Sequence, residues 1–171
     1  YDFSQLMNVI LQVGNALGYA HSVGVLHRDI KPDNILIGPY GEVLLLDWGL
    51  AKVWHSAEDG ESGQTDVPDL DVGVSMTSAG KLEGSVMYMS PEQVDRETDI
   101  DFRSDIYSLG AVMYEALTGQ TPFTGTLVRK ILDDVRHKVP ETPSHFGNLA
   151  VPKVLSDLTM KCLSKDPDDR P

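Results

Sequence analysis

One segment near the middle of the chain, SDIYSLGAVMYEALTGQTPF at residues 104–123, constrains the fold more than any other. Its residue spacing predicts a helix, with Ser104 at the N-cap, Gly119 just beyond the C-terminus and Pro122 as the stop. The apolar side chains do not form one stripe but go most of the way round the predicted helix: Ile106, Leu109, Val112, Met113, Ala116 and Leu117. A helix that is apolar on most sides is usually buried. We therefore expect the rest of the chain to fold around it.

Other helices are predicted on both sides of this segment. Apolar residues recur at three- and four-residue spacing in three stretches, at residues 6–20, 127–135 and 153–163. Asp2 and Ser4 are candidate N-caps of the first of these helices, and Gly24 ends it. The fold is therefore expected to be mainly helical.

A small sheet is predicted near the beginning of the chain. Two short apolar runs, at residues 35–37 and 43–46, flank the turn-forming sequence GPYGE and predict a β hairpin. No internal repeat is visible, and nothing in the pattern indicates a second domain. We expect one domain of the α+β class, mainly α with a small β hairpin.

Composition excludes several classes of partner and environment. With 41% apolar and 23% charged residues, the chain has the composition of a soluble globular domain. Its net charge of −12 argues against a nucleic-acid partner, because the phosphate backbone would be repelled. The single cysteine, Cys162, cannot form an internal disulfide and is expected to be a small buried apolar residue. No apolar run approaches the roughly 20 residues of a membrane span, so we expect a cytoplasmic domain. Whether a membrane anchor lies outside these residues is left open.

The charge is concentrated in one stretch, residues 55–80, which contains no Lys or Arg and six carboxylates: Glu58, Asp59, Glu61, Asp66, Asp69 and Asp71. The stretch shows no hydrophobic period, which predicts a solvated loop. A pseudosubstrate-like mask and a docking surface are the alternatives.

The polar sequence HRDIKPDN at residues 27–34 leads directly into the first strand of the hairpin, and Asp47 follows the second strand. Asp29 and Asp47 can therefore both lie at the mouth of the small sheet. The Asn34 amide oxygen and the Asp47 carboxylate are hard oxygen ligands that suit Mg²⁺. Lys31 supplies a cation where negative charge must be neutralised. These features together indicate phosphoryl transfer, although Asp and Asn also serve in loops that need only turn hydrogen bonds.

Five elements of the sequence, in this order, resemble the eukaryotic-type (Hanks-type) protein kinases. HRDIKPDN at 27–34 is similar to their catalytic loop, DWG at 47–49 to their DFG element, and GSVMYMSPEQ at 84–93 to the segment ending in Ala-Pro-Glu. SDIYSLG and the closing DPDDRP resemble the central helix and a late Arg-containing turn. Lys31 and Ser85 resemble the Ser/Thr-specific branch, whereas YMSPEQ and DWGLAK look most like the bacterial members.

The resemblance implies an enzyme that uses ATP and Mg²⁺ and phosphorylates Ser or Thr hydroxyls of protein substrates. By resemblance, Asp29 would align the substrate hydroxyl and Lys31 would stabilise charge on the transferred group. Asn34 and Asp47 would ligate Mg²⁺, and Leu36 would form the floor beneath the adenine ring. Ser85 would lie in the segment that faces the substrate.

Several other residues are expected to be structural. By resemblance, His27 packs against Trp48, which stands where most kinases have Phe, and joins a buried hydrophobic column. Glu92 and Arg170 are expected to form an ion pair, and Asp105 to bond the backbone of the loop at 27–34. None of these side chains is expected to take part in the chemistry.

Regulation is expected in the activation segment, residues 47–92. Arg28 adjoins Asp29, and in kinases with this Arg a phosphorylated loop residue pairs with it and orders the segment. Thr77 is the first candidate for that residue, followed by Ser75 and Ser78.

Some kinase motifs do not occur in these 171 residues, namely a Gly-rich phosphate loop, a VAIK-like strand lysine and its partner Glu helix. We therefore expect residues 1–171 to be a partial kinase domain, a C-terminal lobe without the N-terminal lobe that acts in cis. If so, residues 1–171 alone should show negligible phosphoryl transfer. Apolar surface should also be left uncovered near Leu36 and Trp48.

Two alternatives remain at this point. A pseudokinase or scaffold lobe would have the same fold, but the polar catalytic positions in this window are all filled. A small-molecule phosphotransferase of the aminoglycoside kinase type would share the His-x-Asp…Asn pattern, but lacks the Ser-Pro-Glu segment and is not expected to carry Lys31.

Overall fold

The computed structural model describes residues 2–53, 84–145 and 151–171 of the chain. Within these residues the fold is rich in helix and contains two small two-stranded sheets. The helices are α1 (Phe3–Ser22), α2 (Pro91–Val94), α3 (Phe102–Thr118), α4 (Val128–His137) and α5 (Lys153–Cys162). The strands are β1 (Val25–Leu26), β2 (Ile35–Ile37), β3 (Val43–Leu45) and β4 (Lys52–Val53). None of the helices in the described residues combines the length and apolar character needed to cross a membrane.

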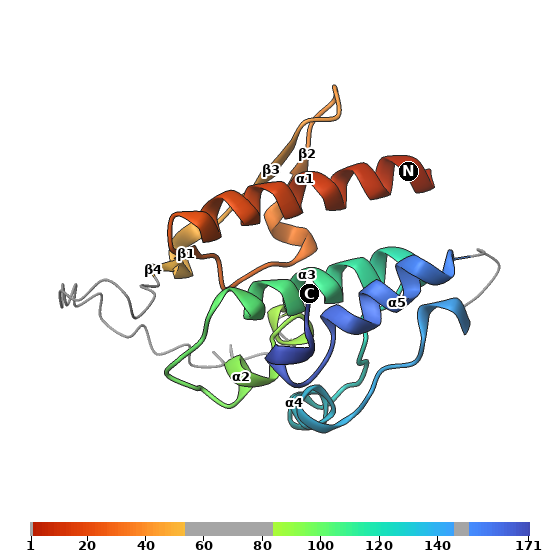
Figure 1. The fold of residues 1–171 in the computed structure, drawn as a ribbon. Coiled ribbons are helices and arrows are strands. Elements are labelled where there is room, and N and C mark those ends of the chain that lie inside the picture. The colour runs from red at the N-terminus through yellow and green to blue at the C-terminus, as the bar shows by residue number, and fades with distance from the viewer. Residues whose placement is uncertain (1, 54–83, 146–150) are drawn as a thin grey trace.

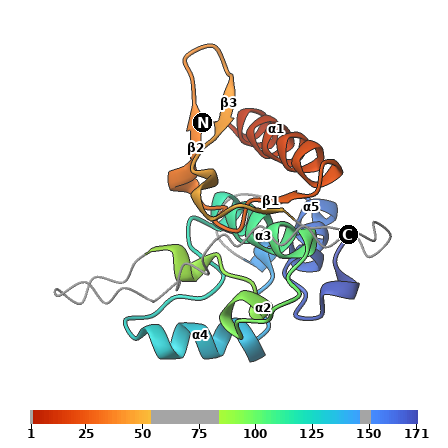
Figure 2. The same cartoon turned by 90° about the vertical axis from the view of Figure 1, so that its left-hand side faces the viewer.

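Helix α3 lies in the middle of the molecule, as its apolar pattern predicts. In both views α1 and the β2–β3 hairpin lie on one side of α3, and α2 and α4 lie on the other (Figures 1 and 2). Helix α3 packs directly against α1 and α5. More than half of its residues are buried: Ser104, Asp105, Tyr107, Ser108, Gly110, Ala111, Val112, Met113, Tyr114 and Leu117.

The prediction that Ser104 caps this helix is wrong, because the N-cap of α3 lies three residues earlier. Asp101 is the N-cap, and its carboxylate accepts hydrogen bonds from the backbone N–H of Arg103 at 2.9 Å and from the guanidinium of Arg103. The Ser104 hydroxyl instead lies 2.7 Å from the Ser90 hydroxyl in the buried contact between α3 and α2. The C-terminus agrees with the prediction, since Gly119 ends the helix with a left-handed φ of 78°.

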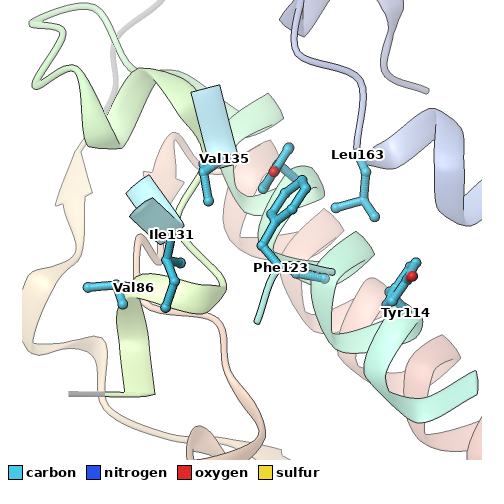
Figure 3. Packing of buried hydrophobic residues seen from close by; sticks show 8 residues of the cluster. Val86, Tyr114, Phe123, Ile131, Val135 and Leu163 are labelled. Atoms are coloured by element: carbon cyan, nitrogen blue, oxygen red, sulfur yellow. The ribbon is translucent and has the colours of Figure 1, made fainter. Parts of the chain in front are cut away.

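Two apolar clusters lie on either side of α3. One joins α3 to α4 and the C-terminal region (Figure 3) and contains Val86, Tyr107, Ala111, Tyr114, Phe123, Ile131, Val135 and Leu163. The other joins α3 to α1 and contains Ile10, Val13, Leu17, Ile30, Val112 and Met113. Because both clusters share α3, this helix connects the region of the hairpin with the region of α4.

The helix pair α3 and α5 packs at very close range. A Cβ atom placed on Gly110 would lie 2.6 Å from the Cβ of Cys162, so only glycine fits there. Cys162 is 6% exposed, which agrees with its predicted role as a small buried residue, and burial raises the pKa of its thiol to about 11.

The β hairpin and the N-terminal helix form as the sequence predicts. Strands β2 and β3 are antiparallel, with Ile35 opposite Leu45 and Ile37 opposite Val43. Asp2 caps α1 in a reciprocal box with Gln5. The second sheet, in which β1 pairs with β4, was not predicted, because a two-residue strand has no readable period.

Candidate active site

The polar sequence at residues 27–34, which we call the polar loop, folds back so that its functional side chains meet. Pro32–Asn34 form one turn of 3₁₀ helix, which brings Asn34 back towards Asp29. The Asn34 amide nitrogen donates to the Asp29 carbonyl oxygen at 2.8 Å and to the Asp29 carboxylate at 3.1 Å. The Lys31 ammonium donates to the same carboxylate oxygen, Oδ2, at 2.7 Å. Asp29 is therefore held between a cation and an amide.

Lys31 also connects the polar loop to the Ser-Pro-Glu segment. Its ammonium donates to the Ser85 hydroxyl at 2.7 Å, and Ser85 lies 54 residues further along the chain. The Asp29 and Lys31 side chains are 15% and 17% exposed, so this pair is largely but not completely removed from water. A hydroxyl group from solvent or from a substrate could still approach the carboxylate.

The hairpin brings the residue before Asp47 into contact with the polar loop. The backbone N–H of Leu46 donates to the Asn34 carbonyl oxygen at 2.8 Å, which fixes the next residue, Asp47, near the polar loop. Asp47 has a left-handed φ of 61°, and its exposed carboxylate accepts a hydrogen bond from the Gly49 backbone N–H at 3.3 Å.

The residues present fit a magnesium ion better than a metal that needs many protein ligands. Both contacts of the Asn34 side chain to Asp29 use the amide nitrogen, so the amide oxygen is the atom that can ligate a metal. Among the described residues, no group of three His, Cys, Asp or Glu side chains could hold a metal. One carboxylate and one amide oxygen suit Mg²⁺, which keeps several waters and takes few protein ligands.

An exposed apolar surface lies on the hairpin. Leu36 on β2 is opposite Leu44 on β3, and the two side chains are 51% and 53% exposed. Trp48, just beyond β3, is 38% exposed. We call these three residues the hairpin patch. Their exposure agrees with the uncovered apolar surface that the sequence predicts near Leu36 and Trp48.

His27 is fully buried and lies against Trp48, with 4.5 Å between the ring centroids. Its Nε2 atom donates to the Leu46 carbonyl oxygen at 3.0 Å, and its Nδ1 atom accepts from the Asp29 backbone N–H at 3.3 Å. These contacts fit the neutral tautomer with the proton on Nε2. The expected contact between His27 and Trp48 is present, but the column is not buried at its Trp48 end.

Asp105, at the start of α3, holds the backbone of the polar loop. Its carboxylate accepts hydrogen bonds from the backbone N–H of His27 at 2.9 Å and of Arg28 at 2.8 Å. A third contact comes from His21 on α1, whose Nε2 atom lies 2.8 Å from the carboxylate. Arg28 has a left-handed φ of 71°, so the loop is strained at the residue before Asp29. Asp105 therefore binds the loop at its strained position.

The ion pair expected between Glu92 and Arg170 is present, with nitrogen–oxygen distances of 2.6 and 2.9 Å. The two side chains are 7% and 0% exposed. Arg170 also donates hydrogen bonds to the carbonyl oxygens of Arg103, Ser164 and Lys165. Its guanidinium therefore has hydrogen-bond acceptors in addition to the Glu92 carboxylate. Such a buried pair fixes the position of α2 relative to α3 and the C-terminal residues.

Two contacts near the site were not predicted from the sequence. The Gln93 amide nitrogen donates to the Arg28 carbonyl oxygen at 2.8 Å. The Tyr88 hydroxyl donates to the Glu115 carboxylate at 2.6 Å, and burial together with Glu115 raises the pKa of Tyr88. The one available signal was the spacing of Gln93, three residues after Ser90, which is typical of a helix capping box. The phosphorylation candidates Thr77, Ser75 and Ser78, and the acidic stretch at 55–80, lie outside the described residues.

Comparison with known proteins shows the family of the chain. The sequence model of the protein kinase domain matches residues 1–171. The serine/threonine-protein kinase PknD of Protochlamydia amoebophila is 42% identical, over 96% of this chain and 17% of its own length. The probable serine/threonine-protein kinase PknB of Bifidobacterium longum is 38% identical, over 95% of this chain and 21% of its own length. PknB of Mycobacterium tuberculosis is 36% identical, over 96% of this chain and 24% of its own length.

These relatives are bacterial Ser/Thr kinases, and the chain spans only between 17% and 24% of the length of the three. The match nevertheless covers nearly the whole chain, including the polar loop, Asp47 and the Ser-Pro-Glu segment. The chain belongs to the protein kinase domain family, the Hanks-type kinases, and the relatives named here are bacterial.

Proposed function

We propose that this chain is part of a Ser/Thr protein kinase that transfers the γ-phosphoryl group of ATP to Ser or Thr hydroxyls of proteins. The observation that carries the proposal is the set of contacts around Asp29, whose carboxylate is held by Lys31 and Asn34 while Lys31 also reaches Ser85. In this proposal the polar loop is the catalytic loop and residues 47–92 are the activation segment.

Asp29 and Lys31 would perform the positioning and the charge stabilisation. A carboxylate is a weak base, so the role of Asp29 is to accept the hydrogen bond of the substrate hydroxyl and to align its oxygen for in-line attack. Lys31 supplies a fixed positive charge next to the oxygens of the transferred group. Its second bond, to Ser85, ties this charge to the segment that would face the protein substrate.

Asn34 and Asp47 would hold Mg²⁺ through the amide oxygen and the carboxylate. Bound there, Mg²⁺ supplies charge neutralisation for the phosphate oxygens. The chain's own contribution would be to bring the two segments that carry these ligands together, through the backbone bond from Leu46 to Asn34. The contacts of Asn34 with Asp29 support this assignment, because they keep one of the two ligands next to the residue that would align the hydroxyl.

Leu36 would form the floor beneath the adenine ring, within the hairpin patch. The roof over ATP and the lysine that grips its phosphates are not found among these 171 residues, so we assign them to an N-terminal lobe elsewhere in the protein. The exposure of Leu36 and Leu44 supports such a covering lobe. Arg28 would pair with a phosphate on Thr77, or on Ser75 or Ser78, in the active state.

A test of the proposal uses the full-length protein and its Asp29→Asn variant in a phosphoryl-transfer assay with Mg-ATP and a basic protein mixture. We expect the parent protein to form phosphoserine or phosphothreonine, and the variant to lose roughly 10²–10⁴-fold in kcat. The exposed carboxylate of Asp99 lies outside the site, so Asp99→Asn should retain the parent rate.

Two results would reject the proposal. A parent protein that binds Mg-ATP without transferring phosphate would be a pseudokinase. A parent protein that phosphorylates a small molecule and no protein would belong to a different class of phosphotransferase.

A further inference from the structure

We propose that Gln93 is a positioning residue, which holds the carbonyl group of Arg28 and thereby couples α2 to the polar loop. The inference rests on the proposed kinase function, since it concerns the orientation of Asp29 in that reaction. Gln93 itself does not contact Asp29, and its effect is expected to pass through the backbone.

The first argument is that helix capping uses only part of the Gln93 side chain. The Ser90 backbone N–H donates to Oε1 of Gln93 at 3.0 Å, and the Gln93 backbone N–H donates to the Ser90 hydroxyl at 3.3 Å. This capping box needs an acceptor at position 93, which a glutamate would also provide. The amide nitrogen is not part of the box, and it donates to the Arg28 carbonyl oxygen at 2.8 Å, 65 residues away.

The second argument is the conformation of Arg28. Its φ of 71° is unfavourable for a residue with a side chain and has to be held by surrounding contacts. Its N–H donates to Asp105 at 2.8 Å, and its C=O accepts from Gln93 at 2.8 Å. The two peptide groups that flank the Cα of Arg28 are therefore fixed by α3 and by α2. The second of these peptide groups leads directly into Asp29, so its orientation sets the direction of the Asp29 side chain.

The third argument is that α2 is itself rigidly held. The Ser90 hydroxyl lies 2.7 Å from the Ser104 hydroxyl of α3, and both residues are buried. Glu92, the neighbour of Gln93, forms the buried ion pair with Arg170. A hydrogen bond from such a fixed base can hold a strained loop, whereas one from an exposed flexible side chain could not.

The test compares two variants in the full-length protein. Gln93→Glu keeps the acceptor of the capping box and removes the N–H donor, and Gln93→Met removes the donor without adding charge. For both variants we expect kcat to fall about tenfold or more, because Asp29 is misaligned, while the KM for ATP stays within about twofold of the parent value. The stoichiometry of Mg-ATP binding by calorimetry should equal that of the parent, which separates misalignment from a loss of folded protein.

Gln5→Glu is the matched control, since Gln5 closes the same kind of capping box with Asp2 on α1 and is exposed. It should leave kcat unchanged. Parent-like kcat in Gln93→Glu would overturn the inference, and so would a loss in Gln93→Glu combined with parent-like kcat in Gln93→Met, because charge alone would then explain the loss. If Gln93→Met does not fold, the inference is judged on Gln93→Glu alone: a lower kcat with parent-like Mg-ATP stoichiometry supports it, and a parent-like kcat overturns it. An inactive parent protein would instead reject the proposed function.

Discussion

Lys165 is the residue whose surroundings differ most from those of an ordinary surface lysine. Its ammonium donates to the Val135 carbonyl oxygen at 2.5 Å and lies 4.5 Å from the centroid of the Phe123 ring. Burial, followed by the nearby charge of Arg170, lowers the pKa of Lys165 from 10.5 to about 8. The two effects outweigh the attraction of the Asp134 carboxylate, so the native state holds the proton of Lys165 less tightly than the unfolded chain does.

This environment predicts a pH dependence of stability. Below about pH 8 the amine is protonated in both states, and between about pH 8 and 10.5 the unfolded chain holds a proton that the native chain has lost. The contribution of Lys165 to the free energy of unfolding should therefore rise with pH across that window. Denaturant unfolding of the parent and of Lys165→Met at pH 7 to 10 measures it as the difference between the two curves.

The exposed Lys161 on α5 provides the control, because Lys161→Met removes a positive charge from the same region without changing a buried contact. Parallel curves for the parent and Lys165→Met would contradict the prediction. Acting in the opposite direction, the buried Cys162 thiol has its pKa raised to about 11 and lowers stability at high pH. The charge of Lys161 lowers this pKa, so the Cys162 contribution cancels between the parent and Lys165→Met but changes in Lys161→Met.

At the scale of elements, the contact between α3 and α5 depends on one glycine. Gly110→Ala would place a methyl group 2.6 Å from the Cβ of Cys162, and backbone movement would be needed to relieve the clash. We expect the free energy of unfolding to fall by about 1–3 kcal/mol, as for other overpacked helix contacts. Equilibrium denaturation with urea measures this loss.

Gly18→Ala on α1 is the matched control, because nothing lies within 4 Å of the added Cβ and the residue is exposed within a helix. This substitution should raise stability by roughly 0.5–1 kcal/mol through the unfolded state and helix propensity. If both alanine variants gained stability, the close packing of α3 against α5 would be wrong.

At the scale of the whole molecule, the hairpin patch is the feature that bears on activity. Leu36, Leu44 and Trp48 are each more than a third exposed, next to the residues that would align the hydroxyl and hold Mg²⁺. A nucleotide bound there would meet the chain on one side only and would remain open to water on the other.

We therefore expect the 171-residue chain alone to bind Mg-ATP weakly and to show negligible phosphoryl transfer. The full-length protein should exceed its rate by at least about a thousandfold, because both closure over the nucleotide and phosphate binding would be missing. The comparison is made at equal concentration, after circular dichroism has shown that the shorter chain is folded. Similar rates for the two proteins would show that this chain needs no covering lobe.

The sequence alone determined the elements whose information is local. The helical period predicted α1, α4 and α5 to within a few residues, the GPYGE turn predicted the β2–β3 hairpin, and the encircling apolar residues predicted the central position of α3. The ordered motifs predicted the kinase family, which the match over residues 1–171 confirms. Each of these signals depends on residues that are close in the chain, where spacing translates directly into geometry.

Only the tertiary structure decided which distant groups meet. Asp101 rather than Ser104 caps α3, and the Ser104 hydroxyl instead contacts that of Ser90, the N-cap of α2. The contact of Gln93 with Arg28 spans 65 residues and that of Asp105 with His21 spans 84, and no period or turn motif encodes either one. A polar side chain can bond any partner within about 3 Å, so its partner is fixed only when the packing of the helices brings the two elements together.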